Sequence, residues 1–178
     1  MNNKRVIGTT INEIVKYWAA HVDESELSVD FSEAHERCWR CGYETKLEKC
    51  HIVPYSLGGQ DTAENLILLC SMCHSEGPNI ADPDFFWDWL KANKATFYNT
   101  YWINRGMREY EFIYKKSIVQ ELLDLKTSDV EVISDLLREQ MEKASWHWGQ
   151  PRMNPATIAG VFRMIVKKLQ SEAKQKYR

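Results

Sequence analysis

Four of the five cysteines form two Cys-x-x-Cys pairs, Cys38 with Cys41 and Cys70 with Cys73, and 28 residues separate the pairs. Thiolates in this spacing can close a tetrahedral Zn²⁺ site, and four protein sulfurs leave no coordination position for water. A site of that kind holds a fold together and carries out no reaction. The sequence therefore predicts a structural Zn²⁺, and the alternative is a set of four ordinary buried cysteines.

Two histidines and one amide, His51, Asn65 and His74, lie between or beside the cysteine pairs. A zinc ion that joined the two pairs would clamp both ends of the segment between them and hold His51 close to His74. Neither histidine is required by a four-sulfur site. Because imidazole titrates near neutral pH and can act as a general base, these residues predict a second centre that is able to react.

The stretches "HIVPYSLGG" at 51–59 and "ENLILLC" at 64–70, framed by the cysteine pairs, resemble the HNH nuclease family. The resemblance covers roughly residues 37–80 and implies a ββα-metal fold. It implies three roles: His51 is the general base, Asn65 holds the connecting loop, and His74 is a ligand of a catalytic divalent ion.

By the same resemblance, the expected activity is metal-dependent hydrolysis of DNA phosphodiester bonds, leaving 5′-phosphate and 3′-hydroxyl ends. The setting would be restriction, a phage, a mobile element or defence, and the gene bacterial or phage-encoded. Two other classes stay open. One is a zinc-stabilised nucleic-acid-binding module that has lost cleavage, and the other is a subunit whose nuclease acts only inside a partner complex.

The sequence departs from the family pattern at Cys50. Many members place an aspartate or a histidine directly before the first histidine, as a second ligand of the catalytic ion. A soft thiolate suits Mg²⁺ poorly, so the choice among Mg²⁺, Mn²⁺ and Ni²⁺ is open. The alternative is that Cys50 is a small buried side chain that binds nothing. Some members carry a further histidine three residues after the last one, where this chain has Gly77.

Short elements must position these residues. The segments 47–53 and 65–69 read as two strands, joined by a loop with Pro54 and a glycine pair. A helix that carries Cys73 and His74 can run for only about two turns, because a Gly-Pro step follows at 77 and 78.

Four helix starts can be read from capping patterns. They are the capping-box spacings Thr10/Glu13 and Ser128/Glu131, and the cap-proline steps Asp82-Pro83 and Asn154-Pro155. Beyond residue 95 the signals are helical, and the secondary structure of the aromatic-rich stretch 96–116 is left open. The expected fold class is α+β and mostly helical, with a small zinc-stabilised ββα-metal module. Its predicted parts are an N-terminal helix and acidic connector (1–36), the nuclease module (37–94) and a helical region (95–178).

The formal net charge of −2 is unevenly distributed. Residues 1–94 hold 9 Lys/Arg and 15 Asp/Glu, whereas residues 95–178 hold 14 and 10, which gives −6 and +4. The second part is thus the natural source of phosphate contacts with DNA. The candidates are Arg163, Lys167, Lys168 and Lys174, followed by Lys176 and Arg178. The alternative is a solvated helix face.

Other chemically capable side chains fit no site. His21, His35 and His147 lie outside any ligand spacing and are expected on the surface or in packing. The aromatic residues at 85–89 recur at helical spacing and are expected in a core, with a base-stacking platform as the alternative.

The odd number of cysteines and their paired spacing favour a reduced compartment over a disulfide framework. The polar start lacks the apolar core of a secretory signal, and no apolar run is long enough to span a bilayer. We therefore expect an intracellular, cytoplasmic protein that binds DNA and no membrane, with a homodimer or a partner protein left open.

Overall fold

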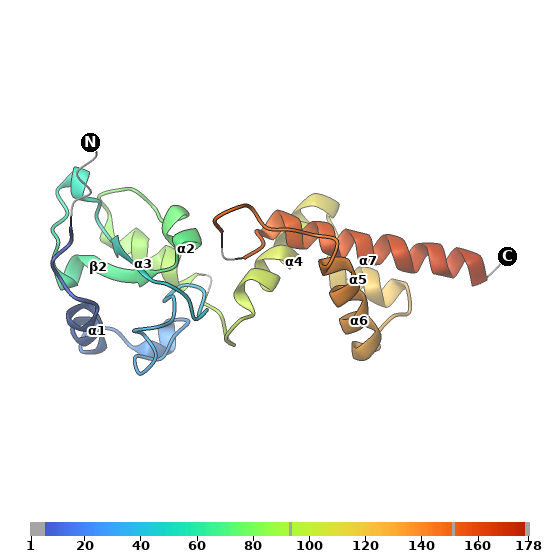
Figure 1. Ribbon diagram of the computed structural model, residues 1–178, viewed down its shortest axis with the longest axis horizontal. Coiled ribbons are helices and arrows are strands. Elements are labelled where there is room, and N and C mark those ends of the chain that lie inside the picture. Colours follow the sequence, from blue (N-terminus) through green and yellow to red (C-terminus); the bar gives the residue numbers. More distant parts are fainter. Residues whose placement is uncertain (1–5, 93, 151, 177–178) are drawn as a thin grey trace. The chain divides into compact units, whose positions relative to one another are not determined.

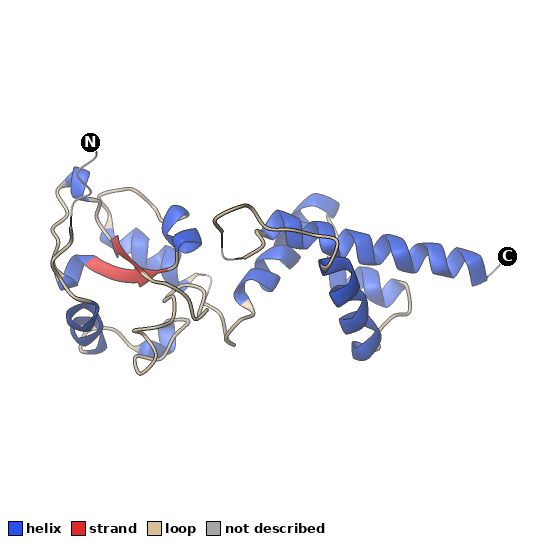
Figure 2. Cartoon of the chain, viewed as in Figure 1, coloured by secondary structure: helices blue, strands red, loops and turns tan. Residues whose placement is uncertain are grey.

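The computed structural model describes residues 6–92, 94–150 and 152–176 and divides the chain into two compact units, Met1–Tyr101 and Trp102–Arg178. The chain order of the elements can be followed in Figure 1, and Figure 2 distinguishes helices from strands. The first unit contains α1 (Ile11–Ala19), β1 (Glu48–His51), β2 (Leu66–Leu69), α2 (Ser71–Ser75), α3 (Pro83–Lys91) and three short 3₁₀ turns, Glu24–Glu26, Tyr55–Leu57 and Ala63–Asn65.

Strands β1 and β2 pair in antiparallel fashion, with His51 opposite Leu66. The strand predicted over 47–53 stops at His51, and β2 begins after Asn65. The ladder ends there because the side chain of Asn65 forms hydrogen bonds with both the N–H and the carbonyl of Val53. These two backbone groups are then no longer available to pair with a neighbouring strand. The hairpin is therefore closed by a side chain just beyond His51, the residue at which β1 ends.

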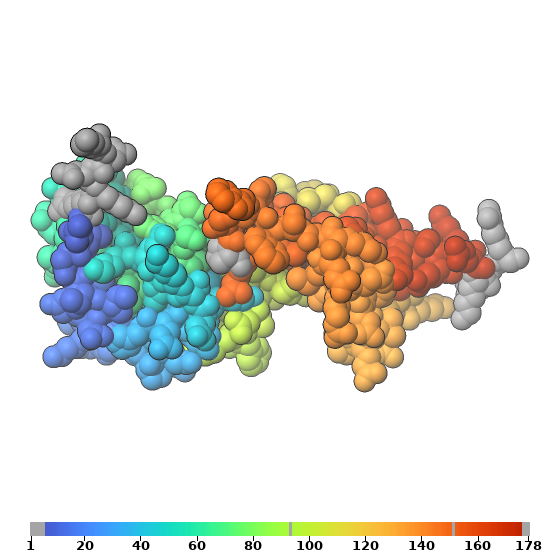
Figure 3. Space-filling view, in the orientation of Figure 1, coloured from blue at the N-terminus to red at the C-terminus, as the bar shows by residue number. Residues whose placement is uncertain are grey.

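Strand β2 forms the centre of the first unit, since all four of its residues are buried. Helix α1 packs against it, and the indole N–H of Trp18 donates to the Leu66 carbonyl at 2.8 Å. The backbone N–H of Trp39, from the segment of the first cysteine pair, donates to the Leu68 carbonyl at 3.1 Å. In the space-filling view, the blue atoms of α1 and the pale blue and cyan atoms that follow it form one continuous mass (Figure 3).

Three of the predicted helix starts are confirmed. Thr10 and Glu13 form a full capping box at the start of α1. Asp82 caps α3, with Pro83 in the first turn. The side chain of Asn154 accepts a hydrogen bond from the third residue of α7. These caps satisfy N–H groups that have no partner inside the helix.

The fourth start lies one residue later than the capping pattern predicts. Helix α6 (Val130–Met141) is capped by Asp129 and not by Ser128. The Asp129 carboxylate accepts from the N–H groups of Glu131 and Val132, at 2.9 and 3.4 Å. A carboxylate is as good a cap as a hydroxyl and also offsets the positive end of the helix dipole, so the aspartate takes the position.

The second unit is helical and contains α4 (Tyr101–Tyr114), α5 (Ile118–Asp124), α6 and α7 (Pro155–Lys176). The first residue of α4, Tyr101, is the last residue of the first unit. Helix α4 accounts for most of the aromatic stretch. Gly106 on α4 lies against Ile158 of α7 so closely that an added Cβ would be 2.3 Å from the Ile158 side chain. None of the described helices is both long and apolar enough to cross a membrane.

Candidate metal centre and histidine pocket

The four paired cysteines come together in the first unit. Their sulfur atoms lie within 4.8 Å of one another, and all four side chains are buried. Cys38 and Cys41 lie on a tight turn that Gly42 closes, with its N–H donating to the Cys38 carbonyl at 2.8 Å. Gly42 has a φ of +70°, which favours glycine. Among the residues that the structure describes, no other group of three or more His, Cys, Asp or Glu side chains gathers in this way.

The second pair comes from the start of α2, where Cys70 is the N-cap and its sulfur accepts from the Cys73 N–H at 3.4 Å. Hydrogen bonds from Cys38, Cys41 and Cys73 lower the pKa of Cys70. The pKa values of Cys41 and Cys73 are raised, first of all by their hydrogen bonds to Cys38. Four thiols this close can share one negative charge but cannot all ionise without a cation. A buried four-sulfur set of this kind suits Zn²⁺.

Asn65 lies directly before β2 and fixes both ends of the connecting loop. Its Oδ1 accepts from the Val53 N–H at 2.9 Å, and its Nδ2 donates to the carbonyls of Val53 and Gln60, both at 3.0 Å. Gly59 leaves the space for this amide, since an added Cβ would lie 2.7 Å from Nδ2 of Asn65 and 1.8 Å from the Val53 carbonyl oxygen. The arrangement fixes the backbone two residues beyond His51.

His51 is the last residue of β1, and its Nε2 lies 2.8 Å from Oδ1 of Asp61. Both side chains are mostly buried, with 18% and 19% of their surface exposed. A carboxylate can only accept, so Nε2 carries the hydrogen and Nδ1 is the basic nitrogen of the neutral ring. Asp61 is held in turn by Thr9, whose hydroxyl donates to its carbonyl.

His74 is the fourth residue of α2, and its Nδ1 lies 2.7 Å from Oε2 of Glu48, the first residue of β1. This pair is more exposed, at 39% for His74 and 46% for Glu48. Sequence reasoning missed both Glu48 and Asp61. The available signals were weak: Glu48 lies two positions before Cys50, on the same strand face, and Asp61 follows the glycine pair closely.

The two histidines line one pocket of about 110 Å³. The remaining walls are Cys50, Pro54, Tyr55, Gly77, Pro78 and Asn79. Asn65 is not among the lining residues and acts on the pocket through the loop. The space is large enough for an ion with several waters, since one water occupies about 30 Å³ of liquid.

The family model of the HNH endonuclease matches residues 36–77, which include both cysteine pairs, His51, Asn65 and His74. Residues 36–77 form an HNH domain. The predicted family and the α+β fold with a small zinc-type module are thereby confirmed. Comparisons with curated proteins and with solved structures found no match. The HNH domain indicates a nuclease-type function that concerns nucleic acid.

Cys50 lies inside the HNH domain with only 4% of its surface exposed. Burial, the largest cause, raises the pKa of its thiol to about 12. The thiol donates to the carbonyl of His51 at 3.6 Å. It does not join Glu48 and His74 in a metal-binding group, within the part of the chain that is described. These contacts favour a packing role for Cys50 over a ligand role.

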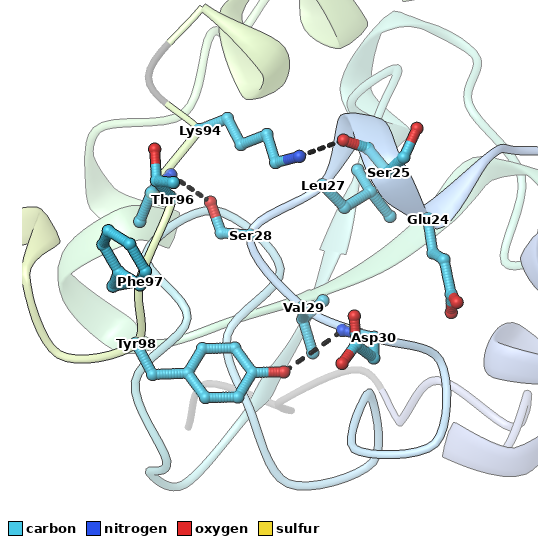
Figure 4. Close-up of a pocket in the computed structure, with 11 residues that line it drawn as sticks. Glu24, Ser25, Leu27, Ser28, Val29, Asp30, Lys94, Thr96, Phe97 and Tyr98 are labelled. Carbon is cyan, nitrogen blue, oxygen red and sulfur yellow. Dashed lines mark hydrogen bonds between the residues drawn. The ribbon is translucent and has the colours of Figure 1, made fainter.

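A larger cavity of about 310 Å³ lies outside the residues matched by the HNH model, between the connector at 24–30 and the segment that follows α3 (Figure 4). Lys94 donates to the Ser25 carbonyl across it, and the Asp30 N–H donates to the hydroxyl of Tyr98 at 3.3 Å. No histidine or cysteine lines it. The size of a cavity therefore does not identify the reactive site in this molecule.

Two of the four candidate DNA contacts are engaged within the second unit. The guanidinium of Arg163 lies 3.7 Å from the carboxylate of Glu121. The ammonium of Lys168 pairs with Glu139. The same two carboxylates would compete with a phosphate for these cations.

The other two candidates are better placed for a polyanion. Lys167 and Lys174 lie on α7 with exposed side chains. Of the two basic residues that follow, Lys176 is described only in its backbone, and Arg178 lies outside the described residues.

The remaining histidines are placed as expected for surface or packing residues. His21 stacks on Tyr17 with ring centroids 4.1 Å apart, and His35 and His147 are exposed. Of the aromatic residues at 85–89 on α3, Phe86 is buried and Trp87 and Trp89 are half-buried, as expected for a core. The prediction is wrong for Phe85, which is 48% exposed.

Proposed function

We propose that the chain is a metal-dependent endonuclease that hydrolyses DNA phosphodiester bonds, with residues 37–94 as the nuclease module. One observation carries the proposal: His51 and His74 come from different elements, line the same pocket, and are each held at one ring nitrogen by a carboxylate. A module that only bound nucleic acid would not need two oriented imidazoles beside one cavity.

In this proposal His51 is the general base. Asp61 holds the hydrogen on Nε2, so Nδ1 accepts the proton of the attacking water. The carboxylate also stabilises the imidazolium that forms. Asn65 keeps the backbone beyond β1 in place, so the ring returns to the same position after each proton transfer.

His74 is the proposed ligand of a divalent ion, Mg²⁺, Mn²⁺ or Ni²⁺. When bound, such an ion would offset the charge that develops on the leaving 3′ oxygen. The products would be 5′-phosphate and 3′-hydroxyl ends. Restriction, phage, mobile-element or defence roles all fit this chemistry.

Incubation of zinc-loaded protein with supercoiled plasmid and each divalent ion tests the proposal. Wild type should produce nicked circles, EDTA should stop the reaction, and His51→Ala should lower the rate by about 10²- to 10⁴-fold. His35→Ala, which changes an exposed histidine of the same unit, is the matched control. Plasmid binding without nicking under every ion would instead support a binding module or a subunit that needs its complex.

A further inference from the structure

The contact between His74 and Glu48 admits two chemical interpretations. At 2.7 Å, Nδ1 and Oε2 are at hydrogen-bond distance. They are also about as far apart as two neighbouring ligands of one divalent ion, because metal–nitrogen and metal–oxygen bonds of about 2.1 Å at right angles place the two donor atoms about 3 Å apart. In the second case both atoms bind the same ion.

The surroundings favour shared coordination. Glu48 and His74 are about two-fifths exposed, so an ion can reach them and keep some of its waters. Mg²⁺ and Mn²⁺ are commonly held by one or two carboxylates, with waters and substrate phosphate completing the shell. Cys50, which occupies the position expected for the second ligand, is 4% exposed and donates its thiol hydrogen to a carbonyl.

We propose that Glu48 and His74 together hold the catalytic divalent ion, with Glu48 supplying the hard anionic ligand that position 50 lacks. Glu48 and residue 50 are two apart on β1 and share a strand face, so the carboxylate comes from the same side of the strand. This inference rests on the proposed nuclease function, and it makes an oxygen-preferring ion, Mg²⁺ or Mn²⁺, the natural cofactor.

Titration of the zinc-loaded 178-residue chain with Mn²⁺, followed by electron paramagnetic resonance of the free ion, tests the proposal without DNA. Glu48→Gln keeps an oxygen that accepts from the His74 ring but removes the negative charge. It should weaken Mn²⁺ binding by about tenfold or more. Glu36→Gln, an exposed carboxylate of the same unit, is the matched control and should bind as wild type does.

An unchanged Mn²⁺ affinity in Glu48→Gln, with zinc content and circular dichroism intact, would overturn the proposal, because Glu48 would then only orient His74. Glu48→Asp provides a second variant that retains the charge, and it should bind Mn²⁺ more tightly than Glu48→Gln. Plasmid nicking distinguishes failure of the proposed nuclease function from failure of the proposed role of Glu48. Nicking by wild type with normal Mn²⁺ binding by Glu48→Gln refutes only the role of Glu48. Mn²⁺ binding that depends on Glu48, without nicking, refutes the nuclease.

Discussion

The four-cysteine cluster and the histidine pocket lie at the same short hairpin, yet they are opposite kinds of site. The cluster is buried and offers only sulfur, so an ion held by all four thiolates would have no position left for water. The pocket is open, is lined by imidazoles, and has two carboxylates attached to those rings. Burial and donor type therefore separate the two proposed roles: a closed sulfur site would stabilise the hairpin, and an open nitrogen and oxygen site would remain able to react.

Cys41→Ser should produce the largest effect, because it opens the closed site. Structural zinc sites contribute about 10 kcal/mol or more of binding free energy to folding, so loss of one ligand should unfold most of residues 38–80. Zinc content by elemental analysis and the thermal transition by circular dichroism are the measurements. A zinc-free variant that melts like wild type would show that the cluster is ordinary packing and not a structural metal site.

Asp61→Asn should change the open site alone. Asparagine can turn its NH₂ group toward Nε2 and favour the wrong tautomer of His51, so nicking should slow by about 10- to 100-fold, the range seen for outer partners of functional histidines. Thermal stability and zinc content should stay as in wild type. The tautomer can be read from ¹⁵N chemical shifts of the ring, and an unchanged His51 tautomer with unchanged rate would leave Asp61 without a role.

Charge reversal of Lys167 and Lys174 tests whether DNA binding depends on cations of the second unit. Each lost phosphate contact should lower the slope of log affinity against log salt by about one, so the double variant should lose about two. Lys16→Glu, on α1, is the control for a general change in charge. Equal slopes in all three proteins would assign α7 to a solvated helix face.

Cys50→Ala should have the smallest effect. It removes a packed sulfur and should cost about 1 kcal/mol of stability. The order of nicking rates among Mg²⁺, Mn²⁺ and Ni²⁺ should not change. A shift of that order toward Mg²⁺ would show that the thiol does reach the ion, and the open site would then also use sulfur.

The sequence was enough to predict the cluster because cysteines three apart must share one tight turn or helix start, which is a local property. The roles given to His51, Asn65 and His74 came from the family resemblance, and they stay proposals. Glu48 and Asp61 could not be chosen from the sequence, since carboxylates are common on every surface. The folding of β1 and of the connecting loop decides which carboxylates come to lie beside a histidine.

The bonds of Asn65 leave room for extra chain at a defined place. The carbonyls of Val53 and Gln60 both accept hydrogen bonds from the Asn65 amide, so the backbone between them is a loop whose two ends are fixed. Gly58 lies within it, exposed, with a φ of +95° and open space around its α-carbon. The entropic cost of closing this loop grows only slowly with the number of residues inserted. A short insertion carrying a fluorophore at Gly58 could therefore report the arrival of nucleic acid while both histidines keep their positions.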